Sequence, residues 1–310
     1  MRVLVTGGTG YLGSAIVRAL VRRGHDPIVF ARRASASGLP GRLVDGDVRD
    51  RQALARAAKG TDVLCHAAAL VSVWRRRAAE FDEVNVGGLE SAIAACRAHA
   101  VARLVYTSSF LALPPAGATA VIRANDYQRT KTLARETARR AADAGVPIVT
   151  LIPGVVYGPG AATEGNLVGR LISDHVAGRL PGLIGADRPW SYAFVDDVAE
   201  AHVTAIERGR SGAEYLLGGE NAPQMRVFEI VRDATGVALP RRIPFAVATA
   251  AGWIEEARAQ LTGATPLLTR GIVEIFRHDW SMDSRLSVDE LSYRITPLDA
   301  GVVATLGSLR

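Results

Sequence analysis

Cysteine is scarce in this sequence, which has only Cys65 and Cys96 among its 310 residues. Both lie in apolar segments, so we expect buried free thiols in a reducing compartment and no disulfide framework. Apolar stretches are also short, and none reaches the roughly 18 residues that a membrane-spanning helix needs. An apolar strand is expected to start at residue 3, which leaves no room for a signal peptide and predicts a cytoplasmic protein.

The sequence also lacks a basic arm with interleaved aromatic residues. Its net charge is +6, but the arginines are scattered, for example over residues 75–77 and 135–140. We interpret them as solvated helix faces, which argues against a nucleic-acid site. No repeat, low-complexity segment or candidate metal site is found in the sequence. With 48% hydrophobic residues, the chain can form one large domain, or a domain and a smaller lobe.

The chain does contain a glycine-rich turn close to its start. The apolar run Met1–Val5 predicts a buried parallel strand, and Gly7, Gly10 and Gly13 follow it directly. In order, these glycines suit a tight turn, close approach of the backbone to a pyrophosphate, and close packing of the next helix. That helix, expected over Ser14–Arg22, would offer free N–H groups to phosphate. The alternative is a plain strand–turn–helix corner.

The end of the second predicted strand indicates which dinucleotide binds. In NAD-binding proteins an acidic residue there accepts hydrogen bonds from the ribose hydroxyls. Here the strand ends with Phe30-Ala31-Arg32-Arg33 and has no carboxylate. A guanidinium binds a 2′-phosphate in a charge-assisted pair. We therefore expect NADP(H), with NAD(H) as the alternative if Arg32 and Arg33 are only solvated loop charges.

Strands and helices are expected to alternate along the first half of the chain. Strands are predicted at residues 2–6, 27–31, 42–45, 62–66, 103–107 and 147–152, and helices between them, for instance over 84–99 and 127–144. This alternation predicts an α/β fold, a Rossmann-type doubly wound parallel sheet with helices on both faces. We expect an NADP-binding domain over 1–160, with 191–221 returning to it. A smaller substrate-binding lobe of short helices is expected mostly from 161–190 and 222–310.

Two residues in the helix predicted over 127–144 suit proton transfer. Tyr127 and Lys131 are four residues apart, which places both side chains on one helix face, and Asn125 or Asp126 could cap the helix. A nearby lysine ammonium and a cationic nicotinamide both lower the pKa of a phenol, which would let Tyr127 donate a proton while a nicotinamide donates hydride. A hydroxyl that holds the carbonyl oxygen is expected from Thr107-Ser108-Ser109. The Tyr-x-x-x-Lys spacing alone also occurs by chance on helix surfaces.

These motifs occur together with others that are typical of one family. They are Thr6-Gly-Gly-Thr-Gly-Tyr-Leu-Gly13, Gly46-Asp47-Val48, His66-Ala67-Ala68-Ala69, Asn85-Val86-x-Gly88, Thr107-Ser108-Ser109, Tyr127-x-x-x-Lys131, Pro153-x-x-Val156-Tyr157-Gly158-Pro159-Gly160 and Phe194-Val195-Asp196-Asp197-Val198-Ala199. Over nearly its whole length the chain resembles an extended short-chain dehydrogenase/reductase. Within the NAD(P)-dependent epimerase/dehydratase family, it is similar to the dihydroflavonol-4-reductase-like group.

The resemblance implies roles for particular residues, with Ser109, Tyr127 and Lys131 as the catalytic ones. The implied cofactor-binding residues are Gly7, Thr9, Gly10, Tyr11, Leu12, Gly13, Arg32, Arg33, Asp47, Val48, Ala67, Ala68, Ala69, Asn85, Thr107, Ser108, Tyr127, Lys131, Pro153, Gly154, Val155 and Val156. Of these, 47–48 would flank the adenine and 153–156 would meet the nicotinamide end. The alanines 67–69 would pack equally well as core. We expect Asp196 and Asp197 to cap a helix over 198–208.

Two departures from the family pattern bear on the substrate. Val155 stands where nucleotide-sugar enzymes commonly have asparagine, and Trp190 where they tend to have an arginine that grips a diphosphate. An indole in place of a cation favours an uncharged, apolar or aromatic substrate, although Arg188 stands two residues away. We expect the substrate pocket to be bordered by four residues, Val71, Leu111, Tyr157 and Trp190.

The sequence thus predicts an oxidoreductase that uses NADP(H). Its substrate is expected to be a small-molecule ketone, or the corresponding secondary alcohol, that is flavonoid-, steroid- or keto-acid-like. A nucleotide-sugar epimerase or dehydratase is the alternative, and a non-catalytic cofactor sensor is a third, disfavoured because such proteins commonly lack the tyrosine or lysine. A homodimer is left open.

Overall fold

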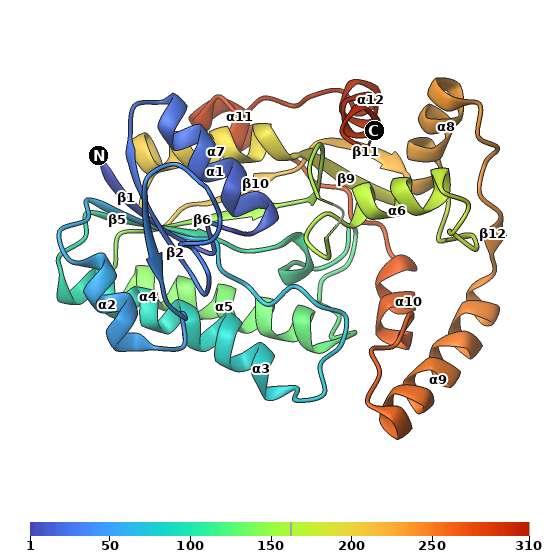
Figure 1. Ribbon diagram of the computed structural model, residues 1–310, viewed down its shortest axis with the longest axis horizontal. Helices are drawn as coiled ribbons and strands as arrows, with labels where there is room; N and C mark the ends of the chain where they lie inside the picture. Colours follow the sequence, from blue (N-terminus) through green and yellow to red (C-terminus); the bar gives the residue numbers. More distant parts are fainter. Residues whose placement is uncertain (162, 310) are drawn as a thin grey trace.

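A computed structural model describes residues 1–161 and 163–309 (Figure 1). Its main sheet has seven parallel strands in the order β10-β6-β5-β4-β1-β2-β3. The strands are β1 (Arg2–Thr6), β2 (Asp26–Ala31), β3 (Arg42–Asp45), β4 (Val63–His66), β5 (Arg103–Thr107), β6 (Ile148–Pro153) and β10 (Glu214–Leu217). Every strand predicted from the sequence is confirmed to within one residue at each end, and the doubly wound α/β fold is confirmed with them.

Helices cover both faces of the main sheet because its strands are apolar on both sides. The helices above the sheet in Figure 1 are α1 (Tyr11–Arg22), α7 (Val195–Arg208) and α11 (Arg285–Leu291). Those below it are α2 (Arg51–Ala58), α4 (Gly87–Ala98) and α5 (Asp126–Asp143). Along β1, Val3 and Val5 pack into the core on the α1 side and Leu4 into the core on the α4 side. The two-residue period of a strand thus supplies both cores.

A second, smaller part of the structure is built around a three-stranded sheet. Its strands, in the order β11-β9-β7, are β7 (Val155–Tyr157), β9 (Pro189–Phe194) and β11 (Glu220–Pro223). The short strands β8 (Leu183–Ile184) and β12 (Arg242–Ile243) pair in parallel. Three helices pack here, α6 (Leu167–Val176), α8 (Gln224–Thr235) and α12 (Leu298–Gly307). β9 and β11 lie at the ends of the 191–221 segment, whereas α7 and β10 between them pack on the main sheet.

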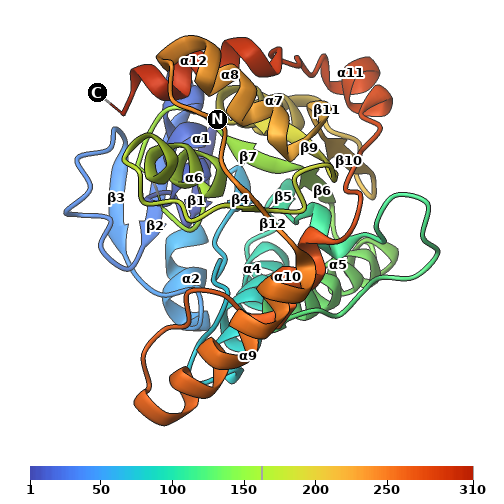
Figure 2. The ribbon, with the colours of Figure 1, turned by 90° about the vertical axis from the view of Figure 1, so that its right-hand side faces the viewer.

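The remaining helices are of unequal length. Three are single turns, α3 (Ala79–Phe81), the π-helix η1 (Asp82–Val86) and the 3₁₀-helix η2 (Phe110–Ala112). A hairpin of two helices projects from the body (Figure 2), α9 (Phe245–Thr262) and α10 (Arg270–Phe276). With 18 residues, α9 is longer than the short helices expected in this region. Within the part of the chain that the structure describes, no helix is long and apolar enough to cross a membrane.

The expected helix cap at Asp196 and Asp197 and the expected solvation of Arg135 are both wrong, whereas the expected buried free thiols are confirmed. Asp196 and Asp197 do not cap α7, because the helix already begins at Val195. The Asp197 carboxylate instead accepts the Thr296 N–H at 2.7 Å, and burial raises the pKa of this carboxyl. Arg135 is not solvated but pairs with Glu214 of β10 at 2.7 Å. Both cysteines are buried free thiols.

Candidate active site

The predicted site residues gather at the carboxyl ends of four neighbouring strands. β1, β4, β5 and β6 lie side by side and end at Thr6, His66, Thr107 and Pro153. The glycine turn, the alanines 67–69, the serines 108–109 and the segment 153–156 continue directly from these ends. The chain order reverses between β1 and β4, and doubly wound sheets bind their ligands at such a switch point.

Close packing explains two of the three glycines in the turn. Gly7 has a φ of +69°, which L side chains rarely adopt. A Cβ at this position would also lie 2.6 Å from Ala68 Cα, and a Cβ on Gly13 would lie 2.1 Å from the Gly7 carbonyl oxygen. β1, β4 and α1 could therefore not approach so closely with other residues. Gly10 is exposed, which leaves its backbone open to a ligand.

The N-terminus of α1 has the properties of a phosphate site. Its N-cap, Gly10, supplies no side-chain hydrogen bond, and the first turn has no acidic residue. The first helical bond runs from the Ser14 N–H to the Gly10 carbonyl, so the N–H groups of residues 11–13 have no partner among the described residues. Free N–H groups and the positive end of the helix dipole favour a bound anion. These residues fit the pyrophosphate of a dinucleotide.

The basic residues at the end of β2 are exposed, as a 2′-phosphate contact requires. Arg32 and Arg33 follow Ala31 and form no salt bridge within the described part of the chain. The neighbouring Asp47 is held by Arg49, with Nη2–Oδ2 at 2.7 Å, and this bond holds the pKa of the carboxyl below its usual range. The charge of Arg32 adds a smaller effect in the same direction. The Asp47 carboxylate is thus already paired with another arginine.

Two buried histidines support the strand ends behind the site. Nδ1 of His66 bonds the Thr6 hydroxyl at 2.9 Å, and burial lowers the pKa of His66 to about 3. Burial also lowers the pKa of His202 to about 4, so its ring is neutral. Because the Val198 carbonyl 2.8 Å away can only accept, Nδ1 of His202 carries the proton and Nε2 accepts from the Thr107 hydroxyl at 2.9 Å. The sequence analysis missed His202, since nothing in its segment distinguishes it from a core residue.

Lys131 is buried at the base of the site. The helix α5 begins after Asn125, whose side chain accepts the Gln128 N–H and confirms the predicted cap. The Lys131 side chain is 3% exposed, and Nζ donates to the Thr107 carbonyl at 3.1 Å. Burial lowers the pKa of this lysine to about 8. Lys131 can therefore hold or release a proton close to neutral pH.

Tyr127 stands one turn before Lys131 on α5. Burial raises the pKa of its phenol to about 12, and hydrogen bonding with Ser109 opposes this rise. The lowered pKa expected from the sequence involves both the Lys131 ammonium and a bound cationic nicotinamide. In the protein alone, burial is the largest effect on the pKa of Tyr127. The phenol therefore stays protonated at neutral pH, as a proton donor must.

Of the two neighbouring serines, Ser109 is the one that interacts with Tyr127. Ser109 also caps η2, since its hydroxyl accepts the Leu111 N–H at 3.3 Å. The hydroxyl of Ser108 is buried and has no bond of normal geometry within the described residues. The structure thus brings Ser109, Tyr127 and Lys131 together at one strand end.

Asn85 has a supporting position rather than one at the surface of the site. Its side chain is buried, and Oδ1 accepts the Leu70 N–H at 2.7 Å. Nδ2 donates to the Leu70 carbonyl at 3.4 Å and to the Thr130 hydroxyl at 3.0 Å. These bonds join the loop after β4 to the helix that carries Tyr127. The amide donors of Asn85 are used in this way, which argues against the predicted contact with a cofactor.

Three of the four residues predicted to border the substrate, Leu111, Tyr157 and Trp190, lie in one buried apolar cluster, and Val71 is not part of it. Leu111 follows Ser109 in η2, and Val71 follows the loop residue that Asn85 holds. Tyr157 and Trp190 lie in the apolar core of the smaller part, where both are almost fully buried. The Trp190 ring packs 4.7 Å from that of Phe276, between centroids. Both side chains are buried, and Trp190 also lines a narrow hollow beside α6 and α8.

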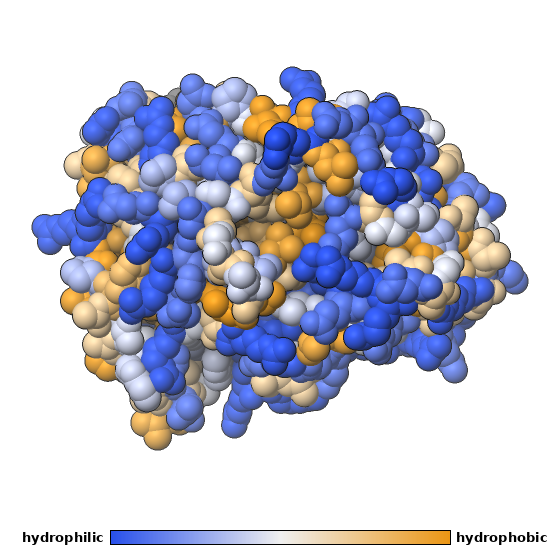
Figure 3. Space-filling view, turned by 180° about the vertical axis from the view of Figure 1, so that it is seen from behind, coloured by the Kyte–Doolittle hydropathy of each residue, from blue (hydrophilic) through white to orange (hydrophobic). Residues whose placement is uncertain are grey.

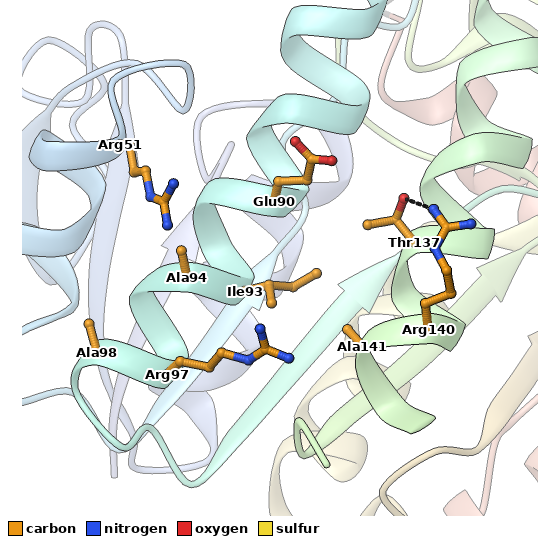
Figure 4. Close-up of a pocket in the computed structure, with 9 residues that line it drawn as sticks. All are labelled: Arg51, Glu90, Ile93, Ala94, Arg97, Ala98, Thr137, Arg140 and Ala141. Atoms are coloured by element: carbon orange, nitrogen blue, oxygen red, sulfur yellow. Dashed lines mark hydrogen bonds between the residues drawn. The ribbon is translucent and has the colours of Figure 1, made fainter. Parts of the chain in front are cut away.

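Hollows on the surface of the molecule differ in their lining from this site. Figure 3 shows an apolar hollow in the middle of the back face, between the half with the main sheet and the half with α6 and α8. A separate depression of about 750 Å³ lies on the outer side of α2, α4 and α5 (Figure 4). It is lined by Arg51, Glu90, Ile93, Ala94, Arg97, Ala98, Thr137, Arg140 and Ala141. None of these is a predicted site residue, so the depression is not the active site.

The sequence matches known proteins over most of its length. Residues 3–218 match the model of the NAD dependent epimerase/dehydratase family. The chain is 33% identical to the 2-alkyl-3-oxoalkanoate reductase of Stenotrophomonas maltophilia, over 88% of each chain. It is also 33% identical to Sterol demethylase protein B of Methylococcus capsulatus, over 78% of this chain and 76% of that protein.

Solved structures show the same architecture. The crystal structure of gox2253 superposes with a TM-score of 0.83 at 28% identity, over 99% of this chain and 97% of that one. The UDP-glucose 4-epimerase of Thermus thermophilus, solved with NAD, shares the fold at 24% identity, with a TM-score of 0.75 over 100% of this chain and 99% of that one. This chain belongs to the NAD dependent epimerase/dehydratase family, as an NAD(P)-dependent enzyme of the extended short-chain dehydrogenase/reductase type.

Proposed function

We propose that the enzyme reduces a ketone in an apolar small molecule with NADP(H), or oxidises the corresponding secondary alcohol. The observation that carries this proposal is the phenol of Tyr127 beside the hydroxyl of Ser109, at the carboxyl end of β5. When bound, a nicotinamide nucleotide supplies the hydride that carbonyl reduction needs.

The protein residues then have three separate tasks. Ser109 donates a hydrogen bond to the carbonyl oxygen and holds it beside Tyr127. Tyr127 donates its proton to that oxygen as negative charge develops there. Lys131 favours the phenolate that remains, because its ammonium has two further N–H donors besides the one on the Thr107 carbonyl.

Names of relatives and the sequence both support an apolar substrate. The two relatives described above are named for a sterol and for a 2-alkyl-3-oxoalkanoate. In this chain Trp190 stands where nucleotide-sugar enzymes tend to have an arginine, and it is buried among aromatic rings. A diphosphate without cationic or N–H partners would be costly to bury. Arg188 is exposed and forms no salt bridge in the described residues, and it is the one observation that favours an epimerase.

A substrate comparison tests this function directly. We expect turnover of hydrophobic ketones in a screen of flavonoid, steroid and β-keto substrates with NADPH and NADH. UDP-glucose should bind poorly in calorimetry, because the site offers few groups for its diphosphate. Micromolar binding of UDP-glucose that is lost in Arg188→Ala, together with no ketone turnover, would replace this proposal by the epimerase.

Replacement of Arg32 tests the preference for NADP(H). We expect Arg32→Ala to weaken NADPH binding by about one to two decades, because a charge-assisted hydrogen bond contributes roughly 1.5–3 kcal/mol. NADH lacks the 2′-phosphate, so its affinity should not change. Titration of both cofactors against wild type, Arg32→Ala and Arg33→Ala separates the two arginines. Equal affinity of the wild type for both cofactors would refute the preference.

A further inference from the structure

The α9 helix directs its large apolar side chains to solvent. Its exposed residues are Ala246, Val247, Ala250, Trp253, Ile254, Ala257, Gln260, Leu261 and Thr262. Their spacing of three and four residues places them on one helix face, and the two polar ones stand at its end. Ile254 is 68% exposed and Leu261 88%, and Leu267 just beyond the helix is 86% exposed. We call these residues together with Leu267 the α9 face.

The opposite side of the helix makes the contacts with the rest of the molecule. Its buried residues are small, Ala248, Gly252 and Ala259. A Cβ on Gly252 would lie 3.0 Å from the Arg270 backbone nitrogen, so α9 packs tightly on α10 through this side. Surface helices usually bury their large apolar residues and expose polar ones. The reversed pattern in α9 therefore indicates a surface that another body covers.

Charges beside the α9 face pair with each other and leave the face itself neutral. Glu255 bonds Arg258 and Glu256 bonds Arg270, each with an N–O distance of 2.7 Å. The Arg270 guanidinium also lies 3.5 Å from the centre of the Trp253 ring and covers one side of it. The other side of the indole stays accessible, as 57% of Trp253 is exposed. An indole with a polar neighbour is typical of residues at a lipid–water boundary.

Unpaired arginines stand at both ends of the helix. Arg241 is exposed and precedes α9 by four residues. At the other end, Arg76 is exposed, and its Nη1 lies 3.6 Å from the position that a Cβ on Gly263 would occupy. Neither arginine has an acidic partner among the described residues. An apolar helix face between cationic groups suits an anionic lipid surface.

We propose that the α9 face binds the surface of an anionic lipid bilayer, with Arg76 and Arg241 directed to lipid headgroups. A second copy of this chain is less suitable as the occupant. An 18-residue helix is about 27 Å long, and covering its outer half buries on the order of 500 Å². A stable protein interface needs roughly 800 Å² from each partner. A bilayer needs only apolar side chains at interfacial depth.

The hairpin is also in contact with the element that carries the candidate catalytic tyrosine. A Cβ on Gly271 of α10 would lie 2.3 Å from the Ala124 carbonyl oxygen, so this backbone packs against the residue before the α5 cap. The hairpin therefore connects the α9 face to the start of the helix that carries Tyr127. The proposed lipid binding does not depend on the proposed substrate, because it follows from the α9 face and its arginines alone. Figure 3 shows apolar colours at the outer end of the projecting hairpin.

Vesicle sedimentation of the full chain tests the proposal. We expect the protein to sediment with phosphatidylglycerol vesicles and far less with pure phosphatidylcholine vesicles. The double variant Ile254→Glu, Leu261→Glu should raise the lipid concentration at half-binding by roughly tenfold or more, since two large apolar side chains no longer enter the lipid. Val303→Glu is the matched control, because Val303 is 53% exposed on α12, away from the hairpin, and should change nothing. The charge-reversing substitutions Arg76→Glu and Arg241→Glu should weaken binding to the anionic vesicles only.

Three outcomes would overturn the proposal. The first is wild-type protein that stays in the supernatant with both kinds of vesicle. The second is equal weakening by Val303→Glu, which would make the binding unspecific. The third is a dimer in sedimentation equilibrium that dissociates in the double variant without vesicle binding, which would assign the α9 face to a second copy. Circular dichroism of each variant checks that the fold is retained.

Discussion

Replacing Tyr127 with phenylalanine should lower kcat by about 10²–10⁴-fold, the usual contribution of a general acid. The phenol is the group from which the carbonyl oxygen would receive its proton, and a tyrosine side chain carries that proton at neutral pH. The phenylalanine ring fills the same space, so cofactor affinity and folding should not change. Steady-state kinetics on a ketone from the screen, with NADPH titration of the same sample, measures both properties.

The two adjacent serines provide matched controls for this prediction. Ser109→Ala removes one hydrogen-bond donor but not the proton source, so it should lose less activity than Tyr127→Phe. Ser108→Ala should have almost no effect, because Ser109 is the serine that interacts with Tyr127. A harmful Ser108→Ala beside a harmless Ser109→Ala would show that the wrong serine was assigned. A phenylalanine variant with most of the wild-type rate would remove Tyr127 from the mechanism.

Replacing Lys131 with methionine should change two properties, the turnover and the pH dependence of the stability. Turnover should fall strongly, because the ammonium that favours the phenolate is lost. Stability, in contrast, should become less dependent on pH. Burial lowers the pKa of Lys131 from 10.5 to about 8, so between these values the unfolded chain binds the proton that the folded protein has released. The free energy of unfolding of the wild type should therefore rise with pH in this window, by up to about 3 kcal/mol.

Urea unfolding at about pH 7.5, 9 and 10, which covers the range between the two pKa values, measures how the stability depends on pH. The free energy of unfolding of the wild type should rise relative to that of Lys131→Met as pH rises, because titration removes the buried charge of Lys131. Lys59 is exposed, so Lys59→Met is a matched control and should follow the wild type. Parallel pH profiles for wild type and Lys131→Met would contradict a buried, charged lysine below pH 8.

Local features of the chain were predictable from the sequence because short-range backbone geometry determines them. Glycines at positions 7, 10 and 13 imply a tight turn wherever the strand lies, and the four-residue spacing of Tyr127 and Lys131 places both on one helix face. Apolar periodicity likewise predicted the strands of the main sheet. These patterns need only neighbouring residues for their interpretation.

Contacts between distant segments were decided by the tertiary structure. The Thr107–His202 bond joins residues 95 positions apart, and the Arg135–Glu214 pair residues 79 apart. The burial of Leu111, Tyr157 and Trp190 in one apolar cluster was likewise decided by the packing of segments that are distant in the sequence. The spacing of a motif does not determine which of its side chains the fold buries.

The sequence by itself determined the fold class, the dinucleotide turn and the tyrosine–lysine pair. Only the tertiary structure decided how these groups behave. It partly buries Tyr127, which raises the pKa of the phenol in the protein alone, and it holds the Lys131 ammonium on a strand carbonyl. It also turns the large apolar residues of α9 outward and its small ones inward. Both results depend on which surfaces pack together, because burial and exposure are properties of the assembled chain and not of any segment in it.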